Sequence, residues 1–108
     1  EISAIHASDA IDRFIADLVY ATRTPAKHSE ELAEWIEIGA SPRASIAFDK
    51  CARALAWLDE RDFVTPEDVR AVAPDVLRHR LTLSYAAEGA GKRPDEVVVE
   101  ILARVAAP

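Results

Sequence analysis

Helix-start signals divide this chain more sharply than any other feature of its sequence. Ser41-Pro42 and Thr65-Pro66 each place a hydroxyl that can cap free amides before a proline in the first helical turn, where its missing N–H costs nothing. Ser8 and Pro94 open two further apolar-periodic runs. Glycine occurs only three times, and strand-like alternation is almost absent. The sequence therefore predicts an all-α fold: a small helical bundle of about four main helices plus short ones, with little or no strand.

Apolar periodicity sets the expected extent of the first two helices. The first should run from Ser8 to about Arg23 and bury one stripe, because its apolar residues recur at steps of three and four. The second should run from Pro42 to about Arg61. The expected inward faces are Ile11, Phe14, Ile15, Leu18 and Val19 in the first helix, and Ala44, Ala47, Phe48, Cys51, Ala54, Leu55 and Leu58 in the second.

The second half of the chain contains the other two main helices. One should start at Glu67 and be divided at Pro74, with a second short helix ending near His79, because an internal proline removes a hydrogen bond and clashes with the preceding turn. The last helix opens at Pro94. The residues expected to face the core are Val69, Val72, Val76 and Leu77, then Val97, Val98, Ile101, Leu102 and Val105.

Three segments are less regular. Residues 24–40 are polar, and a short amphipathic helix is expected at 30–38, ended by Gly39. Residues 80–85 alternate apolar and polar side chains, which predicts a short extended stretch. Residues 89–93 are expected to form a loop. The role of the segment 24–38 stays open.

Length and composition bound the class of protein. A chain of 108 residues with 50% hydrophobic content suits one compact domain over residues 1–108. Because it contains no methionine, not even at position 1, we expect a fragment of a longer protein. The formal net charge of -6 repels phosphate backbones and argues against nucleic acid as a partner. No apolar run approaches the roughly 20 residues that span a bilayer, so we expect a soluble protein without membrane insertion. The single cysteine, Cys51, fits a reducing compartment, so we expect the cytoplasm as its location.

Arg43 is the main candidate for a functional residue. It lies in the first turn of the helix opened by Ser41-Pro42, where a basic side chain is unfavourable at the positive end of the helix dipole. An external anion would be attracted to both the guanidinium and the free amides, and a guanidinium can bind phosphate oxygens in bidentate fashion. The alternative is a solvated or carboxylate-paired arginine. The helix start alone leaves both interpretations open.

Other motifs are interpreted as structural. Gly91-Lys92-Arg93 lacks the earlier glycine and the following serine or threonine of a phosphate-binding loop, which favours a solvated turn. His6, His28 and His79 have no carboxylate or cysteine at ligand spacing, so no metal site is predicted. The single cysteine, Cys51, excludes an internal disulfide and is expected to be a small buried hydrophobe.

The six residues Gly-Ala-Ser-Pro-Arg-Ala at 39–44 resemble the second-sensor motif of MoxR-type AAA+ ATPases. The resemblance extends, in the expected order, to that family's helical lid domain and covers nearly the whole chain. The further matching runs are Asp-Leu-Val-Tyr-Ala-Thr-Arg at 17–23, Arg-Asp-Phe-Val-Thr-Pro-Glu-Asp-Val at 61–69 and Ala-Pro-Asp-Val-Leu-Arg-His-Arg-Leu at 73–81. The magnesium-chelatase ATPase subunit is a close relative within this group.

The resemblance implies that Arg43 reaches the terminal phosphate of ATP bound by the core domain of the same longer chain, with Ser41 and Pro42 shaping its helix start. ATP and Mg²⁺ would be cofactors of that longer protein, an AAA+ ATP hydrolase, whereas this chain alone would bind neither stably and would not hydrolyse ATP. A homo-oligomeric, hexameric ring with chaperone-like remodelling or metal-insertion activity is also implied, as are partners carrying a von Willebrand A domain. For Arg23 and Arg80, which fall in matching runs, a salt-bridge or packing role is favoured.

Two other classes remain open. A free-standing helical interaction module would bind a protein partner through exposed apolar or acidic faces, without nucleotide. Trp35 and Trp57 could belong to such a surface, although core packing is expected of at least one of them. The acidic charge argues against the remaining class, a histone-like helical DNA binder.

Overall fold

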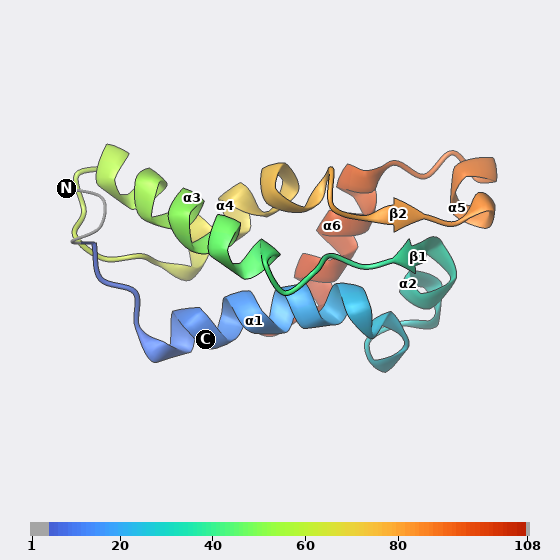
Figure 1. Ribbon diagram of the computed structural model, residues 1–108, viewed down its shortest axis with the longest axis horizontal. Coiled ribbons are helices and arrows are strands. Elements are labelled where there is room, and N and C mark those ends of the chain that lie inside the picture. Colours follow the sequence, from blue (N-terminus) through green and yellow to red (C-terminus); the bar gives the residue numbers. More distant parts are fainter. Residues whose placement is uncertain (1–4, 108) are drawn as a thin grey trace.

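A computed structural model describes residues 5–107 and shows an elongated helical bundle with principal extents of 44 × 21 × 21 Å (Figure 1). Helices account for most of the described chain, which confirms the predicted all-α class. Among these residues, no helix is long and apolar enough to cross a membrane. The elements in chain order are α1 (Asp9–Arg23), the 3-10 helix η2 (Pro25–Lys27), α2 (Glu30–Trp35), β1 (Ile36–Ile38), α3 (Ala44–Leu58), α4 (Pro66–Leu77), β2 (Thr82–Leu83), α5 (Tyr85–Gly89) and α6 (Pro94–Arg104).

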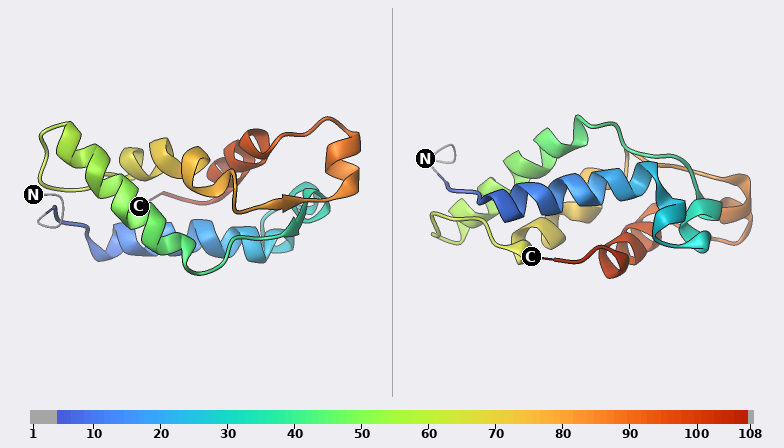
Figure 2. Two further views of the ribbon diagram at one scale, coloured as in Figure 1. Left: turned by 45° about the horizontal axis from the view of Figure 1, so that its top comes forward. Right: turned by 90° about the horizontal axis from the view of Figure 1, so that it is seen from below.

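The core lies between α1, α3, α4 and α6. The most extensive contact is between α3 and α4, while α1 contacts α3, α4 and α6. Figure 2 shows the arrangement of these helices from two further directions. Small residues let α3 approach its neighbours closely, because Ala44, Ala52 and Ala56 are wholly buried there beside Phe48. The largest wholly buried side chains of the other three helices include Phe14, Leu18, Leu77 and Ile101.

Side-chain caps confirm two of the predicted helix starts. The Ser8 hydroxyl accepts a hydrogen bond from the Ile11 amide at 3.2 Å, and all five apolar residues predicted for α1 are buried. At α4, the Thr65 hydroxyl accepts from the Asp68 amide at 3.3 Å while the Asp68 carboxylate accepts from the Thr65 amide at 2.8 Å. This reciprocal capping box satisfies two orphan donors. The last helix begins at Pro94, as predicted.

The start of α3 corrects one prediction. The helix begins at Ala44 rather than Pro42, and Arg43 rather than Ser41 occupies the cap position, with no side-chain cap. Residues 41–43 form a turn whose three carbonyls accept hydrogen bonds from the amides three residues further on, at 2.9 to 3.1 Å. Arg43 already has helical φ and ψ, so a backbone turn, rather than an extended serine with a capping side chain, leads into α3.

The inward face of α3 is narrower than predicted, and the helix ends at Leu58 rather than at Arg61. The predictions that Cys51 and Leu58 are buried are wrong, since both are exposed. The physical reason is that neighbouring helices cover one side of α3 only, so a single residue in every four is fully enclosed. That buried line consists of Ala44, Phe48, Ala52 and Ala56.

Pro74 does not divide the third main helix. α4 continues through it from Pro66 to Leu77, so the predicted break is wrong. An internal proline costs about 3 kcal/mol through its missing N–H and its steric clash. Continuing the helix keeps Val76 and Leu77 in the same buried stripe as Val69, and burying such side chains offsets a cost of this size.

The two strands lie in a small lobe with α2 and α5, at the right-hand end of the molecule in Figure 1. The predicted helix at 30–38 is wrong beyond Trp35, because residues 36–38 form β1, which pairs antiparallel with β2 and places Ile36 opposite Leu83. The extended stretch predicted at 80–85 is confirmed at β2. The sequence interpretation missed α5, although Ser84 caps it by accepting a hydrogen bond from the Ala87 amide at 3.1 Å.

Candidate functional site

The segment that leads into α3 is held against the last turn of α1. The buried Thr22 hydroxyl donates to the Val19 carbonyl at 2.6 Å and accepts the Ala40 N–H at 2.9 Å. Gly39 approaches so closely that an added Cβ would lie 2.2 Å from the Thr22 carbonyl oxygen, so a side chain there requires the backbone to shift. We call Thr22, Gly39 and Ala40 the Thr22 clasp. It determines where the chain enters α3.

The two arginines of the other matching runs bond to backbone carbonyls. Arg23 donates to the Ala40 carbonyl at 3.4 Å and so supports the Thr22 clasp. Arg80 donates to the Val76 carbonyl at 2.7 Å, near the end of α4. The sequence favoured a salt-bridge or packing role for both residues, and the contacts found here are hydrogen bonds to backbone carbonyls.

The Arg43 side chain is exposed at the start of α3. Within residues 5–107 no carboxylate pairs with its guanidinium, whereas Arg61 and Arg78 each bind two carboxylates. The carboxylate-paired interpretation of Arg43 is therefore wrong for the described part of the chain. The guanidinium stays charged at physiological pH and is accessible to a partner.

The first turn of α3 differs from those of the other α-helices in the described chain, because it contains no acidic residue. The start of α3 therefore combines the positive end of a helix dipole with a cation and has no acid in its first turn, which favours an anion as its ligand. The acids in the other first turns include Asp9 and Asp12 in α1, Glu30 and Glu31 in α2, Glu67 and Asp68 in α4, Glu88 in α5, and Asp95 and Glu96 in α6.

The backbone amides of this helix start contribute less than the sequence suggested. The N–H groups of residues 44–46 already donate to the carbonyls of Ser41, Pro42 and Arg43. An anion at this site would be bound chiefly by the guanidinium. Ser41 contributes through its carbonyl, and Pro42 through the fixed φ of its ring, so both act by shaping the turn.

Two adjoining surface hollows lie between α1 and the start of α3. The first has a volume of about 360 Å³ and is lined by residues that include Tyr20, Arg23 and Pro42. The second, of about 330 Å³, is lined in part by Ile46 and shares Ala16 and Ser45 with the first. A hydrogen bond from Lys27, 3.1 Å from the phenol oxygen, lowers the pKa of Tyr20 below its ordinary value. The groove is partly apolar, and Asp17 in the first hollow and Asp12 and Asp49 in the second also line it. Arg43 lines neither hollow but follows Pro42, which lines the first, in the sequence.

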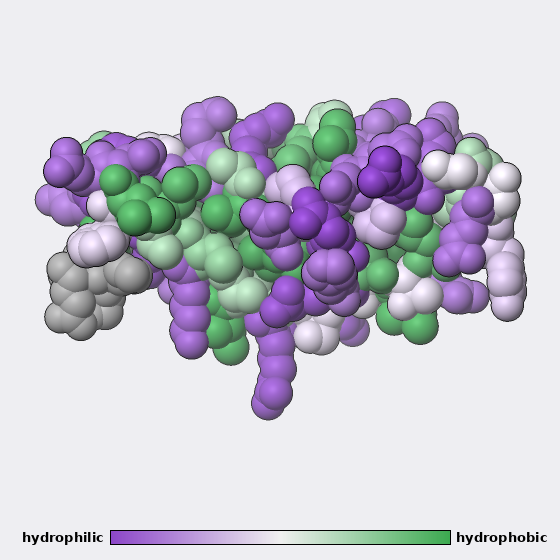
Figure 3. Space-filling view, turned by 90° about the horizontal axis from the view of Figure 1, so that it is seen from above, coloured by the Kyte–Doolittle hydropathy of each residue, from purple (hydrophilic) through white to green (hydrophobic). Residues whose placement is uncertain are grey.

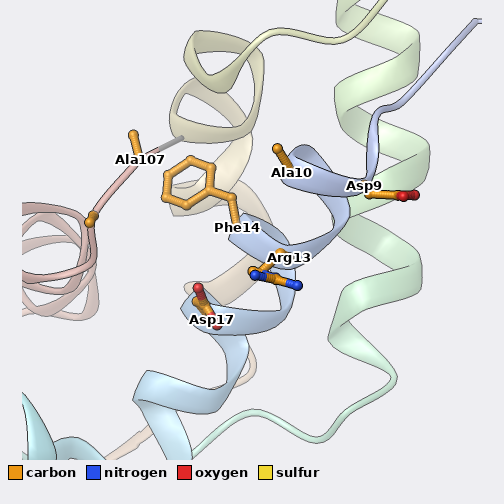
Figure 4. Close-up of a pocket in the computed structure, with 7 residues that line it drawn as sticks. Asp9, Ala10, Arg13, Phe14, Asp17 and Ala107 are labelled. Carbon is orange, nitrogen blue, oxygen red and sulfur yellow. The ribbon is translucent and has the colours of Figure 1, made fainter.

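A third hollow, of about 420 Å³, lies along the first half of α1, away from the Thr22 clasp. Figure 4 shows Phe14 directed from α1 toward Ala107 near the end of the chain, with Arg13 and Asp17 on the same helix. No residue of the segment 39–43 lines it. It shares only Asp17 with the first hollow.

The segment Gly91-Lys92-Arg93 and the two tryptophans have structural surroundings. Gly91 adopts a positive φ of 77° in a turn, and the Lys92 ammonium lies 4.4 Å from the centre of the Trp35 ring. Trp35 packs against the core, whereas the Trp57 side chain is 48% exposed. In the part of the chain that the structure describes, no three His, Cys, Asp or Glu side chains gather into a possible metal site.

The fold is that of a helical lid domain. The chain belongs to the AAA lid domain family of MoxR-type AAA+ ATPases: the family model matches residues 28–101. The chain is similar to Chaperone MoxR1 of Mycobacterium tuberculosis, with 42% identity over 92% of the chain. It is also similar to Protein MoxR of Paracoccus denitrificans, with 43% identity over 80%.

A solved structure and the chelatase group extend these likenesses. The crystal structure of a candidate ATPase from Cytophaga hutchinsonii has a TM-score of 0.94 and 39% identity to the chain, and the match covers 99% of the chain. The magnesium-chelatase subunit ChlI of Nicotiana tabacum is 56% identical over 36% of the chain. The chain spans only about a quarter to a third of these longer proteins: 26% of MoxR1, 27% of MoxR and 33% of the crystallised protein.

Proposed function

We propose that this domain closes over ATP bound by the nucleotide-binding domain of the same longer chain, and that Arg43 contacts the terminal phosphate as the second-sensor arginine. The observation that carries the proposal is the accessible guanidinium at the one α-helix start, among the described residues, that has no acid in its first turn. The Thr22 clasp supports it, because the clasp fixes the position of that helix start relative to α1.

Arg43 would act by electrostatic stabilisation. A guanidinium can bind two phosphate oxygens at once, and its charge stabilises the negative charge of a transferring phosphoryl group. The residues described here fit the phosphate but offer no acidic cluster for Mg²⁺. Mg²⁺ would therefore be held, together with the ATP, by the rest of the longer chain, and there it would neutralise charge on the phosphates.

The remaining functional features belong to the same proposal. The longer protein would be an ATP hydrolase that works in the cytoplasm as a hexameric ring, with chaperone-like remodelling or metal insertion as its task. Chaperone MoxR1 and the magnesium-chelatase subunits bear names that support these two tasks respectively. A partner with a von Willebrand A domain is part of the proposal by family resemblance.

The test is steady-state ATP hydrolysis by the longer protein carrying Arg43→Ala. We expect kcat to fall about a hundredfold, because loss of one preorganised donor to a developing oxyanion costs about this much. Arg43→Lys should recover only part of the rate, since an ammonium cannot bind two oxygens in the same fixed geometry. The matched control is Arg13→Ala, an exposed arginine on α1 outside the segment 39–43. Unchanged turnover in folded Arg43→Ala protein would exclude the sensor role.

A further inference from the structure

The backbone of Ala40 is held by two consecutive residues at the end of α1. Its N–H donates to the Thr22 hydroxyl at 2.9 Å, and its carbonyl accepts a hydrogen bond from the Arg23 guanidinium at 3.4 Å. Ala40 is wholly buried, so water does not readily replace these partners. Both backbone polar groups of this residue therefore depend on side chains that precede it by 18 and 17 positions.

Thr22 is one of two polar or charged residues that are buried within residues 5–107. The other, Asp68, belongs to the capping box of α4. The Thr22 hydroxyl donates its single proton to the Val19 carbonyl at 2.6 Å, so the hydrogen bond from Ala40 uses a lone pair of the same oxygen. Helical threonines commonly make the first bond, whereas the second joins α1 to the segment that leads into α3. Helix formation alone does not account for this second bond.

Little freedom remains between Ala40 and Arg43. The two residues are three positions apart, a distance of at most about 11 Å along the chain. The carbonyls of residues 41–43 accept hydrogen bonds from the amides of residues 44–46 at 2.9 to 3.1 Å, and the ring of Pro42 fixes its φ. Ala44, the first residue of α3, is wholly buried. A displacement of Ala40 would therefore also displace the backbone of Arg43.

The guanidinium of Arg43 lacks comparable support. Its side chain is exposed, and no carboxylate within residues 5–107 pairs with it. Figure 3 shows hydrophilic side chains that extend outward from the surface of the molecule. The reach of an exposed arginine is set mainly by the position of its own backbone, and for Arg43 that position depends on the buried hydrogen bond between Thr22 and Ala40.

We infer that Thr22 is a positioning residue for the reaction: its buried hydroxyl holds Ala40 and so places the Arg43 guanidinium at the distance from the phosphate that hydrolysis requires. The inference rests on the proposed function of Arg43. Thr22 touches no nucleotide and acts only through Arg43, with Arg23 as a weaker support at the Ala40 carbonyl. The hydroxyl thus has an effect on turnover that is separate from its effect on stability.

The first experiment is steady-state ATP hydrolysis by the longer protein carrying Thr22→Val, at a temperature at which circular dichroism shows the variant to be folded. We expect kcat to fall about tenfold, because a displacement of about 1 Å caused by a residue away from the reacting atoms can cost up to a hundredfold. Thr22→Ser retains the hydroxyl and should recover most of the rate. Val98→Ala, at a wholly buried position of α6, destabilises the domain without changing the clasp and should leave kcat unchanged.

A double-mutant cycle separates positioning from a merely structural role. Residues that act as a unit are strongly non-additive, so Thr22→Val should lower kcat by less than about twofold when Arg43→Ala is already present. An equal loss in both backgrounds would overturn the inference and leave the sensor role of Arg43 standing. So would unchanged kcat in folded Thr22→Val protein, or an equal loss in Val98→Ala. Unchanged kcat in Arg43→Ala would instead reject the proposed function, and this inference with it.

Discussion

Replacing Thr22 with valine tests whether the Thr22 clasp holds the functional segment. Valine has nearly the shape of threonine but lacks the hydroxyl that accepts the Ala40 N–H at 2.9 Å and donates to the Val19 carbonyl at 2.6 Å. The Ala40 residue is wholly buried, so water cannot readily replace the lost acceptor. An unsatisfied buried donor costs about 1–3 kcal/mol. We therefore expect the free energy of unfolding to fall by about 2 kcal/mol.

The assay is urea unfolding of the 108-residue chain, followed by tryptophan fluorescence and circular dichroism. In a separate thermal unfolding experiment, a loss of about 2 kcal/mol should lower the midpoint temperature by roughly 8–16 °C for a domain of this length. The matched control is Thr24→Val on the turn that follows α1, because the Thr24 hydroxyl donates to the Tyr20 carbonyl at 3.0 Å in an exposed position. Its effect should stay within about 0.5 kcal/mol.

Equal losses in the free energy of unfolding for Thr22→Val and Thr24→Val would refute this reasoning. Equal effects would mean that burial of the Ala40 amide does not decide the cost. The slope of the unfolding free energy against urea should stay the same in both variants, since neither changes the surface exposed on unfolding.

Two further predictions concern stability. Gly39→Ala should destabilise the chain by about 1–3 kcal/mol in urea unfolding, because its Cβ would meet the Thr22 carbonyl oxygen at 2.2 Å, whereas Gly89→Ala, with open space around it, should be neutral or slightly stabilising. Burial would raise the pKa of Asp68, but hydrogen bonds from Arg61 and Thr65 outweigh it and hold that pKa below its ordinary value. Because the folded-state pKa of Asp68 is lowered, its hydrogen bonds to Arg61 and Thr65 stabilise the folded chain at neutral pH. This stabilisation is lost as the pH falls through about 4 and below. Asp68→Asn should therefore flatten the acid side of a stability profile measured by urea unfolding between pH 3 and 7.

The parts of the fold that sequence reasoning predicted are those governed by local chemistry. Ser8 and Thr65 cap helices because their hydroxyls reach amides three residues away, and the stripe of α1 follows from a spacing of three and four. The errors arise where contacts between residues far apart in the sequence decide which side chains are buried. Whether Cys51 or Ala52 is buried depends on which side of α3 its neighbours cover, and the apolar pattern of that helix extends nearly all round it.

The candidate site shows the same division. Arg43 could be selected from its helix start and its surrounding motif, although the turn at residues 41–43 replaced the expected serine cap. Thr22 was not selected, because nothing in its local sequence indicates that its hydroxyl meets an amide 18 positions later. Gly39 was interpreted as a helix terminator, whereas its lack of a side chain is required by the close approach of the Thr22 backbone.

The most direct measurement of the central claim is the affinity of the longer protein for ATP and ADP, by equilibrium titration, before and after Arg43→Ala. If Arg43 contacts the terminal phosphate, ATP binding should weaken about tenfold or more, the loss of a charge-assisted hydrogen bond, while ADP binding should change little. Equal weakening of both nucleotides, or of neither, would contradict the assignment of Arg43 to the terminal phosphate.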